Sequence, residues 1–523
     1  MPASINSLYS TSDWIGKTLS SLQCVLRLQE RISEIEGYMP RIITAIPFIN
    51  IIEQTRLEYE KVFGKNVDLL IHHGVSDFST KKKDENDEIP IDKVLMEVES
   101  WEGDVILTTF VQLFQSIFTN KNRSLKKIHK LAGSIVVLDE AQAIPEKYMP
   151  LIGAVLQKIA EYYGTRFILM TATQPKLLEF GNRLLKKSDG PLSIPLLPDY
   201  NNYFQRLKRT KFVPLLEKTI TVDEFMGIFK EKWSGNSSAL IVVNTIRRSI
   251  EVFNRIKNCE EFQREGVLIR YLSTNITPIQ RRRVIAGVRR KLLNGAKVIL
   301  VSTQTIEAGV DLDFDIGYRD LAPLESIIQV AGRINRAGEK EDFSPLYVFE
   351  TGSGNSVYRM YNIHKTKEVL TDEIFESQYS QMIKRYYETL LVEDKSYDTE
   401  IYEAIKVLDY NTISSFHLID KQDVCSVIIE CDEKISKLIE DYCTIIKSGK
   451  FDFDTKAELK QIMNKIQGYI VEIRVKKLIS NKPWKFKDIY DINLDLYIVP
   501  KENIKNYYNV TGFIAENKEA LFY

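Results

Sequence analysis

Short, almost uninterrupted apolar runs constrain the fold of this chain more than any other feature of its sequence. They fall in two series, one within the first 170 residues and one between residues 239 and 349. The runs are RIITAI (41–46), DVILTT (104–109), SIVVL (134–138), RFILM (166–170), ALIVV (239–243), VLIRYL (267–272), KVILV (297–301) and LYVF (346–349). Runs without polar alternation suit strands that are buried on both faces, as in a parallel sheet covered by helices.

Segments of helical periodicity separate these runs, so the sequence predicts an α/β chain with two successive parallel-sheet domains. We expect the first domain over residues 1–200 and the second over residues 201–355. From about residue 357 the pattern becomes mainly helical, including a helix over 457–479, with a late strand-like run at 496–499. This part predicts a mainly helical accessory domain over 356–523, and three domains fit a chain of 523 residues.

Composition excludes several classes of protein. The 71 basic and 71 acidic side chains give no net charge, so any nucleic-acid binding must come from local patches. No stretch approaches the roughly 18 to 20 apolar residues that span a bilayer, and the N-terminus has no basic or apolar region of a secretory signal. The five cysteines lack C-x-x-C spacing, which favours buried free thiols in a reducing cytoplasm. We therefore expect a cytoplasmic protein that does not bind a membrane.

Two adjacent carboxylates directly follow the third apolar run, in VVLDEAQ (136–142). Open α/β sheets bind ligands at the carboxyl ends of their strands. Asp139 could hold Mg²⁺ there, and Glu140 could orient a water molecule for attack on a phosphoryl group. Taken alone, the pattern also fits a strand followed by an acidic helix cap. The segment MTATQP (170–175) follows the next run, and its hydroxyl groups could hydrogen-bond these carboxylates.

The second series carries a corresponding pair of segments, VSTQTIEAGVDLD (301–313) and QVAGRINR (329–336). Arg333 and Arg336 are three residues apart, so we expect them on one helical face. If they point across a cleft between the domains, they can neutralise charge on a transferred phosphoryl group, a contribution of roughly 10³ to 10⁵ in rate. In isolation the two side chains would fit a surface pair. The order of D-E-A-Q, T-A-T and Q-x-x-G-R-x-N-R favours the catalytic interpretation.

These motifs resemble motifs II, III and VI of superfamily-two helicases. More closely, the chain resembles the helicase portion of the CRISPR-associated helicase–nuclease family of type I interference, over about residues 16 to 340. The supporting segments are RIITAIPFINIIEQ (41–54), TTFVQLF (108–114), VVNTIRRS (242–249), YLSTNITPIQRR (271–282) and TIEAGVDLD (305–313). The resemblance implies two tandem RecA-like domains with ATP and Mg²⁺ between them and single-stranded DNA across their top. It also implies 3′ to 5′ movement on the strand that a guide-RNA surveillance complex displaces.

The resemblance assigns roles to individual residues. Those implied in catalysis are Glu140, Asp139, Gln142, Arg333 and Arg336. Those implied in ATP binding are Gly16, Lys17, Thr18, Gln329, Gly309 and Asp311, with Thr18 and Asp139 on the metal. Short polar side chains can hold the DNA backbone without reading bases. Those implied here are Thr108, Thr109, Gln112, Asn244, Thr245, Ser273 and Thr305.

The phosphate-binding loop departs from the family pattern. Gly16-Lys17-Thr18 opens a helix at the expected distance from the first apolar run, but Trp14 stands where the family usually has glycine, and Asp13 adds a negative charge. Residues 1–15 also leave no room for the usual first strand. Three explanations stay open: a truncated start, a variant with weakened ATP binding, or a protein that has lost ATPase activity. Because the other catalytic residues are present, we expect a motor in which Lys17 and Thr18 still serve phosphate and Mg²⁺.

Histidine content separates this chain from fused members of the family, which carry a metal-binding HD nuclease domain. The chain has five histidines and no His-Asp dipeptide. We therefore expect an ATP-dependent single-stranded DNA translocase and helicase in type I CRISPR antiviral interference. Its expected partners are a separate HD nuclease subunit and a guide-RNA surveillance complex. Two alternatives stay open: a superfamily-two DNA or RNA helicase outside CRISPR, and an ATPase-weakened scaffold that bridges the surveillance complex and the nuclease.

Overall fold

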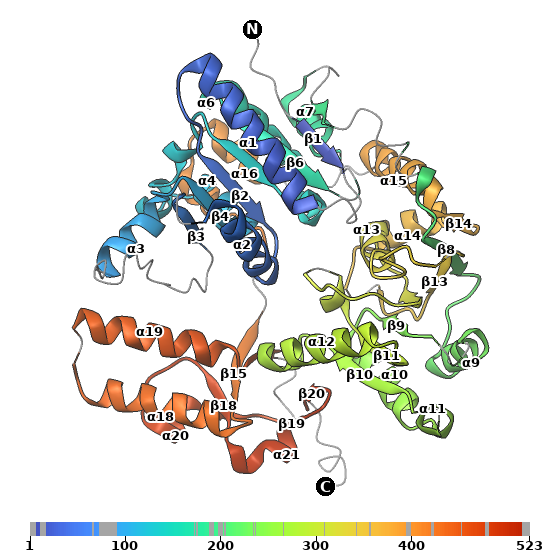
Figure 1. Cartoon of the computed structure of the whole chain (residues 1–523). Helices are drawn as coiled ribbons and strands as arrows, with labels where there is room; N and C mark the ends of the chain where they lie inside the picture. Colours follow the sequence, from blue (N-terminus) through green and yellow to red (C-terminus); the bar gives the residue numbers. More distant parts are fainter. Residues whose placement is uncertain are drawn as a thin grey trace. The chain divides into compact units, whose positions relative to one another are not determined.

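The structure of the chain is a computed structural model, shown in Figure 1. The residues that it describes are 7–10, 17–64, 67–72, 91–171, 173, 176–187, 193–196, 202, 205–233, 235, 237–264, 266–307, 309–340, 342–354, 357–393, 399–419, 423–450, 452–475 and 481–514. Two compact units divide the chain. Residues 1–208 and 365–420 form the first unit, and residues 209–364 and 421–523 form the second.

The first unit contains a parallel sheet in the order β3-β4-β2-β5-β6-β1-β7. Its strands are β1 (Ser7–Ser10), β2 (Ile42–Ile46), β3 (Leu69–His72), β4 (Val105–Thr109), β5 (Ile135–Leu138), β6 (Arg166–Thr171) and β7 (Ile194–Pro195). Four of these strands coincide with the apolar runs of the first series. Every residue of β2, β4 and β5 is buried, as expected for strands covered on both faces. The predicted α/β fold class is confirmed.

The strand β1 corrects one expectation. It pairs in parallel with β6 and β7, and Ser10 lies level with Thr171 at the carboxyl edge of the sheet. The expectation that residues 1–15 leave no room for a first strand is therefore wrong. Four residues suffice because an extended chain advances about 3.3 Å per residue, roughly 13 Å in all.

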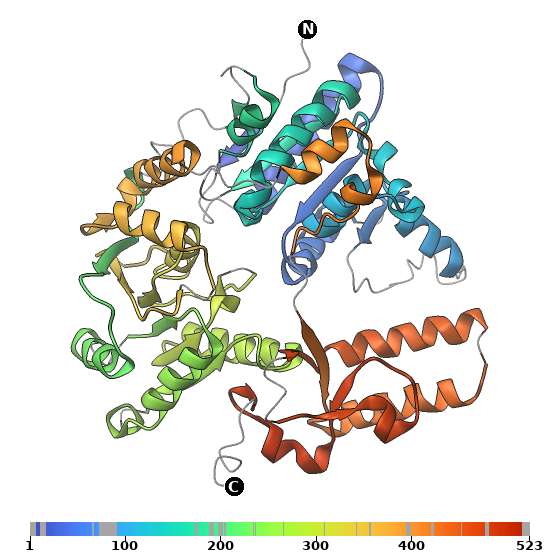
Figure 2. The ribbon, with the colours of Figure 1, turned by 180° about the vertical axis from the view of Figure 1, so that it is seen from behind.

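Helices cover both faces of this sheet. The helices of this unit include α1 (Lys17–Glu36), α2 (Ile49–Phe63), α3 (Ile91–Ser100), α4 (Phe110–Ile117), α6 (Met149–Tyr163) and α7 (Leu177–Leu185), followed by α15 (Tyr379–Glu393), α16 (Glu400–Lys406) and α17 (Tyr410–Ile413). In Figure 1, α1 and α2 lie in front of the sheet, and in Figure 2 α6 and α16 lie in front of it. Leu22 and Val25 of α1 pack against Ile42 and Ile168 of the sheet. The helix α1 ends before Gly37, which has a positive φ of 75°, as a helix C-terminus favours.

The second unit repeats this strand order. Its parallel strands follow the order β10-β11-β9-β12-β13-β8. They are β8 (Thr210–Leu215), β9 (Ala239–Val242), β10 (Leu268–Leu272), β11 (Val298–Ser302), β12 (Ile316–Asp320) and β13 (Ser344–Phe349). The helices of this part include α9 (Val222–Lys232), α10 (Ile246–Lys257), α11 (Glu260–Arg264), α12 (Pro278–Leu293) and α13 (Leu324–Ala331).

Residues 356–523, predicted as one accessory domain, are shared between the two units. The part in the second unit combines helices with a sheet in the order β16-β15-β18-β17. Its elements include β15 (Val424–Ile429), α18 (Glu433–Lys447), α19 (Phe453–Gln467), β16 (Ile470–Arg474), β17 (Trp484–Lys485), β18 (Tyr497–Val499), β19 (Tyr508–Asn509) and β20 (Gly512–Phe513). The helix expected over 457–479 is wrong in its second half. There Ile470–Arg474 alternates in burial and pairs antiparallel with β15, so the period is that of a strand.

Two further findings concern membrane-spanning helices and the cysteines. Within the described ranges, no helix combines the length and the apolar character needed to cross a bilayer. The five cysteines are free. Cys443 is buried, Cys24, Cys259 and Cys425 are partly buried, and Cys431 is exposed, so the expectation of buried thiols holds fully only for Cys443.

Candidate functional site

The carboxyl edge of the first sheet carries the two predicted acids. Asp139 directly follows β5, and its backbone N–H donates to the carbonyl of Ala45 on β2 at 3.0 Å. Glu140 adopts a left-handed backbone with φ 57°, a conformation that costs a residue with a side chain on the order of 1–3 kcal/mol and is concentrated at functional sites. Both acids are partly exposed at the strand end, as a ligand-binding role requires.

Hydrogen bonds fix the Glu140 carboxylate from behind. The side-chain amide of Gln142 donates to Glu140 Oε2, and the hydroxyl of Thr171 donates to Gln142 Oε1 at 2.5 Å. The backbone N–H of Thr173 donates in turn to the Thr171 hydroxyl oxygen at 3.1 Å. The hydroxyl groups of the T-A-T segment thus reach the carboxylate through Gln142, whereas a direct bond was expected.

The helix α1 begins at the same edge, because it follows β1, whose last residue lies level with Thr171. Thr18 is partly buried in its first turn, and its carbonyl accepts the hydroxyl of Ser21 at 2.9 Å. Of the other predicted phosphate-binding residues, Gly16 and the side chain of Lys17 lie outside the described residues. A helix N-terminus beside strand-end carboxylates fits a nucleotide phosphate with its Mg²⁺.

The donor set at this edge also fits Mg²⁺ held through a nucleotide. No group of three or more His, Cys, Asp or Glu side chains that could hold a metal is found in the part of the chain that the structure describes. Nucleotide-bound Mg²⁺ needs no such cluster, because one or two protein groups and the phosphates hold it. Thr18 and Asp139 match that requirement in chemistry. Nearby, Tyr59 bonds the Thr44 hydroxyl at 3.2 Å, and burial, with a contribution from the Asp139 charge, raises the pKa of Tyr59 to about 12.

The arginine motif of the second unit is not helical, which corrects the sequence expectation. The helix α13 ends at Ala331, and Asn335 has a φ of 44°. The reason is a short parallel bridge: the Arg333 carbonyl accepts the Phe314 N–H at 2.9 Å, and the Asn335 N–H donates to the Phe314 carbonyl at 2.8 Å. Arg333 and Arg336 therefore lie on a turn after the helix rather than on one helical face.

Both arginines nevertheless contact the segment 305–313. Arg333 is buried, and its Nη2 donates to the Glu307 carbonyl at 3.0 Å. Arg336 Nη1 lies 3.3 Å from Asp311 Oδ1. The structure thus brings both arginines to this segment, but only Arg336 pairs with Asp311. Gln329 lies on α13 and Gly309 on the segment itself.

A buried ion pair that no sequence motif predicts supports this segment. Arg319 and Glu307 are both buried, with Arg319 Nη2 2.8 Å from Glu307 Oε1. Arg319 also donates to Asn244 Oδ1 at 2.6 Å and to the Tyr358 hydroxyl at 3.1 Å. Burial raises the pKa of Glu307, against the opposing effect of Arg319. An arginine inside a strand gives no local signal of burial, so only its spatial partners reveal the pair.

Most of the predicted DNA contacts lie at or directly after strand ends of the two sheets, whereas Gln112 lies on α4 and Thr305 in a short 3-10 helix. Several of their side chains already have protein partners. Thr108 donates to the His72 carbonyl at 2.8 Å, and Asn244 donates to the Leu321 carbonyl at 2.7 Å. Thr109 and Thr245 cap the helices α4 and α10 by accepting backbone N–H groups. The remaining predicted contacts are Gln112 and Thr305, both partly exposed, and Ser273, which is buried and accepts the Asn275 N–H at 3.1 Å.

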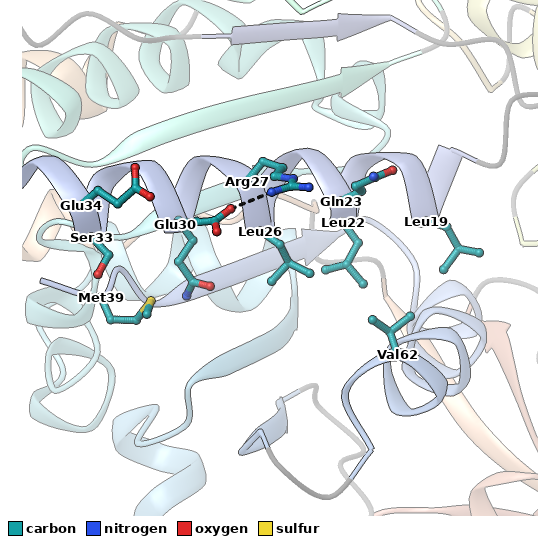
Figure 3. A pocket seen from close by; sticks show the side chains of 11 residues that line it. Leu19, Leu22, Gln23, Leu26, Arg27, Glu30, Ser33, Glu34, Met39 and Val62 are labelled. Carbon is teal, nitrogen blue, oxygen red and sulfur yellow. Dashed lines mark hydrogen bonds and ion pairs between the residues drawn. The ribbon is translucent and has the colours of Figure 1, made fainter.

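A separate hollow of about 660 Å³ runs along the outer side of α1, and Figure 3 shows its lining. Leu22 and Leu26 face Val62 of α2 across it, and the Arg27–Glu30 ion pair of 3.0 Å lies on its wall. None of the predicted site residues lines this hollow. It is therefore distinct from the carboxyl edge of the first sheet.

Comparisons with known proteins agree with the motifs. Residues 14–180 match the model of DEAD/DEAH box helicases, and residues 235–339 match the model of the C-terminal part of the CRISPR-associated nuclease/helicase Cas3. The chain is 28% identical over 413 residues to the CRISPR-associated nuclease/helicase Cas3 of Haloferax volcanii. This match covers 62% of this chain and 44% of that relative.

Solved structures show the same fold. The T. fusca Cas3–AMPPNP structure superposes with a TM-score of 0.67 at 13% identity, over 95% of this chain and 66% of that chain. A chain of a CRISPR RNA-guided surveillance complex, pre-nicking, superposes with a TM-score of 0.59 at 13% identity, over 96% of this chain and 66% of that chain. The chain spans less than half the length of the curated relatives it matches. By its motifs, its fold and these likenesses, the chain is similar to the Cas3 helicases of type I CRISPR systems, within superfamily two.

Proposed function

We propose that this chain hydrolyses ATP to move 3′ to 5′ along single-stranded DNA during CRISPR interference in the cytoplasm. The observation that carries the proposal is the catalytic edge of the first sheet. There the Glu140 carboxylate is held by Gln142, Gln142 is held by Thr171, and Asp139 lies beside them. A carboxylate held in one orientation at a strand end suits the positioning of an attacking water.

The chain's own residues divide the work at this edge. We propose that Thr18 and Asp139 hold Mg²⁺ and that Gly16 and Lys17 bind the phosphates. Bound Mg²⁺ would neutralise charge on the phosphate oxygens. Glu140 would orient the water, and the Gln142 amide would keep the carboxylate from turning away. The contribution of Arg333 and Arg336 to hydrolysis stays a prediction, as do the seven DNA contacts.

The proposed partners follow from the family. One structural neighbour is a chain of a CRISPR RNA-guided surveillance complex, which supports the proposal that this chain acts on DNA opened by such a complex. A separate HD nuclease subunit is the second proposed partner. Activity on targets opened by a surveillance complex, and not on other forked duplexes, would distinguish this role from that of a general helicase.

The test is ATP turnover by the chain with and without single-stranded DNA. We expect DNA-stimulated turnover in the wild type and a loss of roughly 10²- to 10⁴-fold in Glu140→Gln, the usual contribution of a positioned acid–base group. Glu58→Gln is the matched control, because Glu58 forms an exposed pair with Lys61 on α2. A folded wild type that neither binds nor hydrolyses ATP would contradict the proposal and favour the alternative of a scaffold.

Direction is tested separately. A duplex with a 3′ single-stranded overhang loads a 3′ to 5′ motor on the strand that it follows, whereas a 5′ overhang does not. We therefore expect strand separation from the 3′ overhang only. Separation from the 5′ overhang would refute the proposed direction and leave the ATPase proposal intact.

A further inference from the structure

A continuous line of hydrogen bonds joins the catalytic edge to the helix α15, far along the chain. It ends at the hydroxyl of Tyr387, which lies 3.1 Å from the hydroxyl of Thr173 across a sequence separation of 214 residues. We infer that Tyr387 is a positioning residue for the Glu140 carboxylate, and that residues 365–420 thereby set the rate of turnover. The inference rests on the proposed ATPase function.

The donors and acceptors along this line fix one another. The Thr171 hydroxyl oxygen accepts the Thr173 N–H, which leaves its own hydrogen to donate to Gln142 Oε1. Gln142 must then present its NH₂ group to Glu140, as it does. A turned amide would face the carboxylate with a carbonyl oxygen and repel it. The orientation of the Gln142 amide therefore depends on Thr171, and the position of Thr171 depends on Thr173.

Burial raises the free-energy cost of breaking these hydrogen bonds. Thr171, Thr173 and Tyr387 are each 1% exposed, so water cannot replace a lost partner. A buried polar group that loses its partner costs about 1–3 kcal/mol, which favours a shift of Thr173 once the tyrosine hydroxyl is gone. The adjoining ion pair between Lys176 and Glu388, 3.4 Å apart, is partly exposed and contributes little. Tyr387 is therefore a buried polar link between α15 and Thr173 of the T-A-T segment.

A positioning role predicts a particular kinetic change. Tyr387 has no bond in this line to groups expected to bind nucleotide, so its loss should leave the KM for ATP unchanged. The Glu140 carboxylate would be held less firmly, so kcat should fall. Loss of one such hydrogen bond corresponds to roughly a 2- to 10-fold decrease. A merely structural role would lower the melting temperature without this separation of kcat from KM.

The experiment compares three variants of the full chain with wild type. Tyr387→Phe removes the hydroxyl and keeps the ring. Tyr386→Phe is the matched control, because Tyr386 is the fully buried neighbour on the same helix. Thr173→Ser keeps the hydroxyl and should retain wild-type turnover. For each we would measure the melting temperature, the kcat and KM of ATP hydrolysis, and hydrogen exchange of the backbone amides of residues 140–143.

Support requires two results in Tyr387→Phe that Tyr386→Phe lacks: a kcat lower by roughly 2- to 10-fold at unchanged KM, and faster exchange at residues 140–143. Exchange that changes only within α15 and near Thr173 would overturn the inference, as would an unchanged kcat in an active enzyme. The exchange measurement needs no turnover. An inactive wild type whose 140–143 amides still respond to Tyr387→Phe would refute the proposed ATPase function while supporting the link itself.

Discussion

The two sheets have the same strand order, but the aspartates at the ends of two corresponding strands, β5 and β12, have different surroundings. The strand β5 lies beside β2 as β12 lies beside β9, with Leu138 opposite Ala45 and Arg319 opposite Val242. The next residues are Asp139 in the first unit and Asp320 in the second. Corresponding places in one topology thus hold an aspartate in both units, preceded by a leucine in one and by an arginine in the other.

The surroundings of the two aspartates differ. Asp320 is 0% exposed and accepts the Thr351 N–H at 2.9 Å, the Thr351 hydroxyl at 2.8 Å and the Ser353 hydroxyl. Asp139 is partly exposed at its strand end. A carboxylate whose lone pairs are occupied by protein donors is not available to a metal ion. The comparison shows that the topology supplies the position, whereas the side chains around it decide between ligand binding and structural support.

Breaking the buried ion pair of the second unit should have the largest effect. Arg319→Leu copies the leucine of the first unit but leaves Glu307 buried without its cation, so we expect the free energy of unfolding to fall by about 3–5 kcal/mol. Urea denaturation measures it. The loss should be smaller at acid pH, because burial already raises the pKa of Glu307 and the protonated acid needs no counter-charge.

Two controls complete this prediction. Arg289→Leu breaks an exposed pair with Asp311 and should cost under about 1 kcal/mol. The double variant Arg319→Leu/Glu307→Met should recover much of the lost stability, because paired hydrophobic replacement of a buried ion pair is often neutral. An Arg319→Leu variant as stable as Arg289→Leu would contradict the structural role that separates the second unit from the first.

Asp139→Asn should have the next largest effect, and on catalysis rather than on stability. Removing the charge expected to hold Mg²⁺ should lower kcat by roughly 10²- to 10³-fold, the usual size for one electrostatic group at a reacting phosphate or carbonyl. The melting temperature should stay within a few degrees, because the side chain is partly exposed. A stability loss without a kinetic effect would place Asp139 in the same structural class as Asp320.

Asp320→Asn is the reciprocal change and should act mainly on stability. The amide loses the charge that strengthens the bonds from Thr351 and Ser353, so we expect a loss of about 1.5–3 kcal/mol, the usual range for a hydrogen bond to a charged group. Chemical denaturation provides the value, with Asp311→Asn as a partly exposed control in the same unit. If Asp320→Asn lowered kcat in a fully stable protein, the contrast between the two aspartates would fail.

The sequence predicted what local patterns determine. An apolar strand such as 135–138 needs no polar alternation when it is buried on both faces, and the acids at 139–140 mark its carboxyl end. The strand-like run at 496–499 was confirmed by β18 for the same reason. These elements could be predicted because each strand or acid pair is encoded within a few adjacent residues.

The rest depended on contacts between distant residues. The apolar periodicity of α13 predicts a helix through Arg336, but the bridge between Phe314 and Ile334 ends it earlier. From the sequence alone Arg319 would be assigned to the surface. Its burial is explained only by its contacts with Glu307 and Asn244, which are distant in the sequence. Tyr387 gave no signal at all, because its role depends on a hydroxyl 214 residues away.

The last expected effect is a change of stability with pH and concerns Lys127, a basic side chain beside the predicted DNA contact Gln112. Lys127 is buried, its Nζ lies 3.5 Å from Gln112 Oε1 and 5.7 Å from the centre of the Trp101 ring. Burial, with a contribution from the Arg123 charge, lowers the pKa of Lys127 to about 8 from 10.5. In the second unit the basic residue beside Thr245 is Arg248, partly exposed and paired with Glu251 at 2.9 Å, and an arginine stays charged throughout.

The free energy of unfolding should therefore depend on pH through the titration of Lys127. Between pH 8 and 10.5 the unfolded chain binds more protons at this lysine than the folded chain does, so the free energy of unfolding rises with pH by up to about 1 kcal/mol per pH unit. Below pH 8 Lys127 is charged in the folded chain as well, so its burial lowers the free energy of unfolding by the full amount. Urea denaturation from pH 7 to 10 should show that the free energy of unfolding rises more steeply with pH in the wild type than in Lys127→Met. The exposed control Lys126→Met should show the same pH dependence as the wild type. Parallel curves for wild type and Lys127→Met would mean that this lysine is as well solvated as the arginine of the second unit.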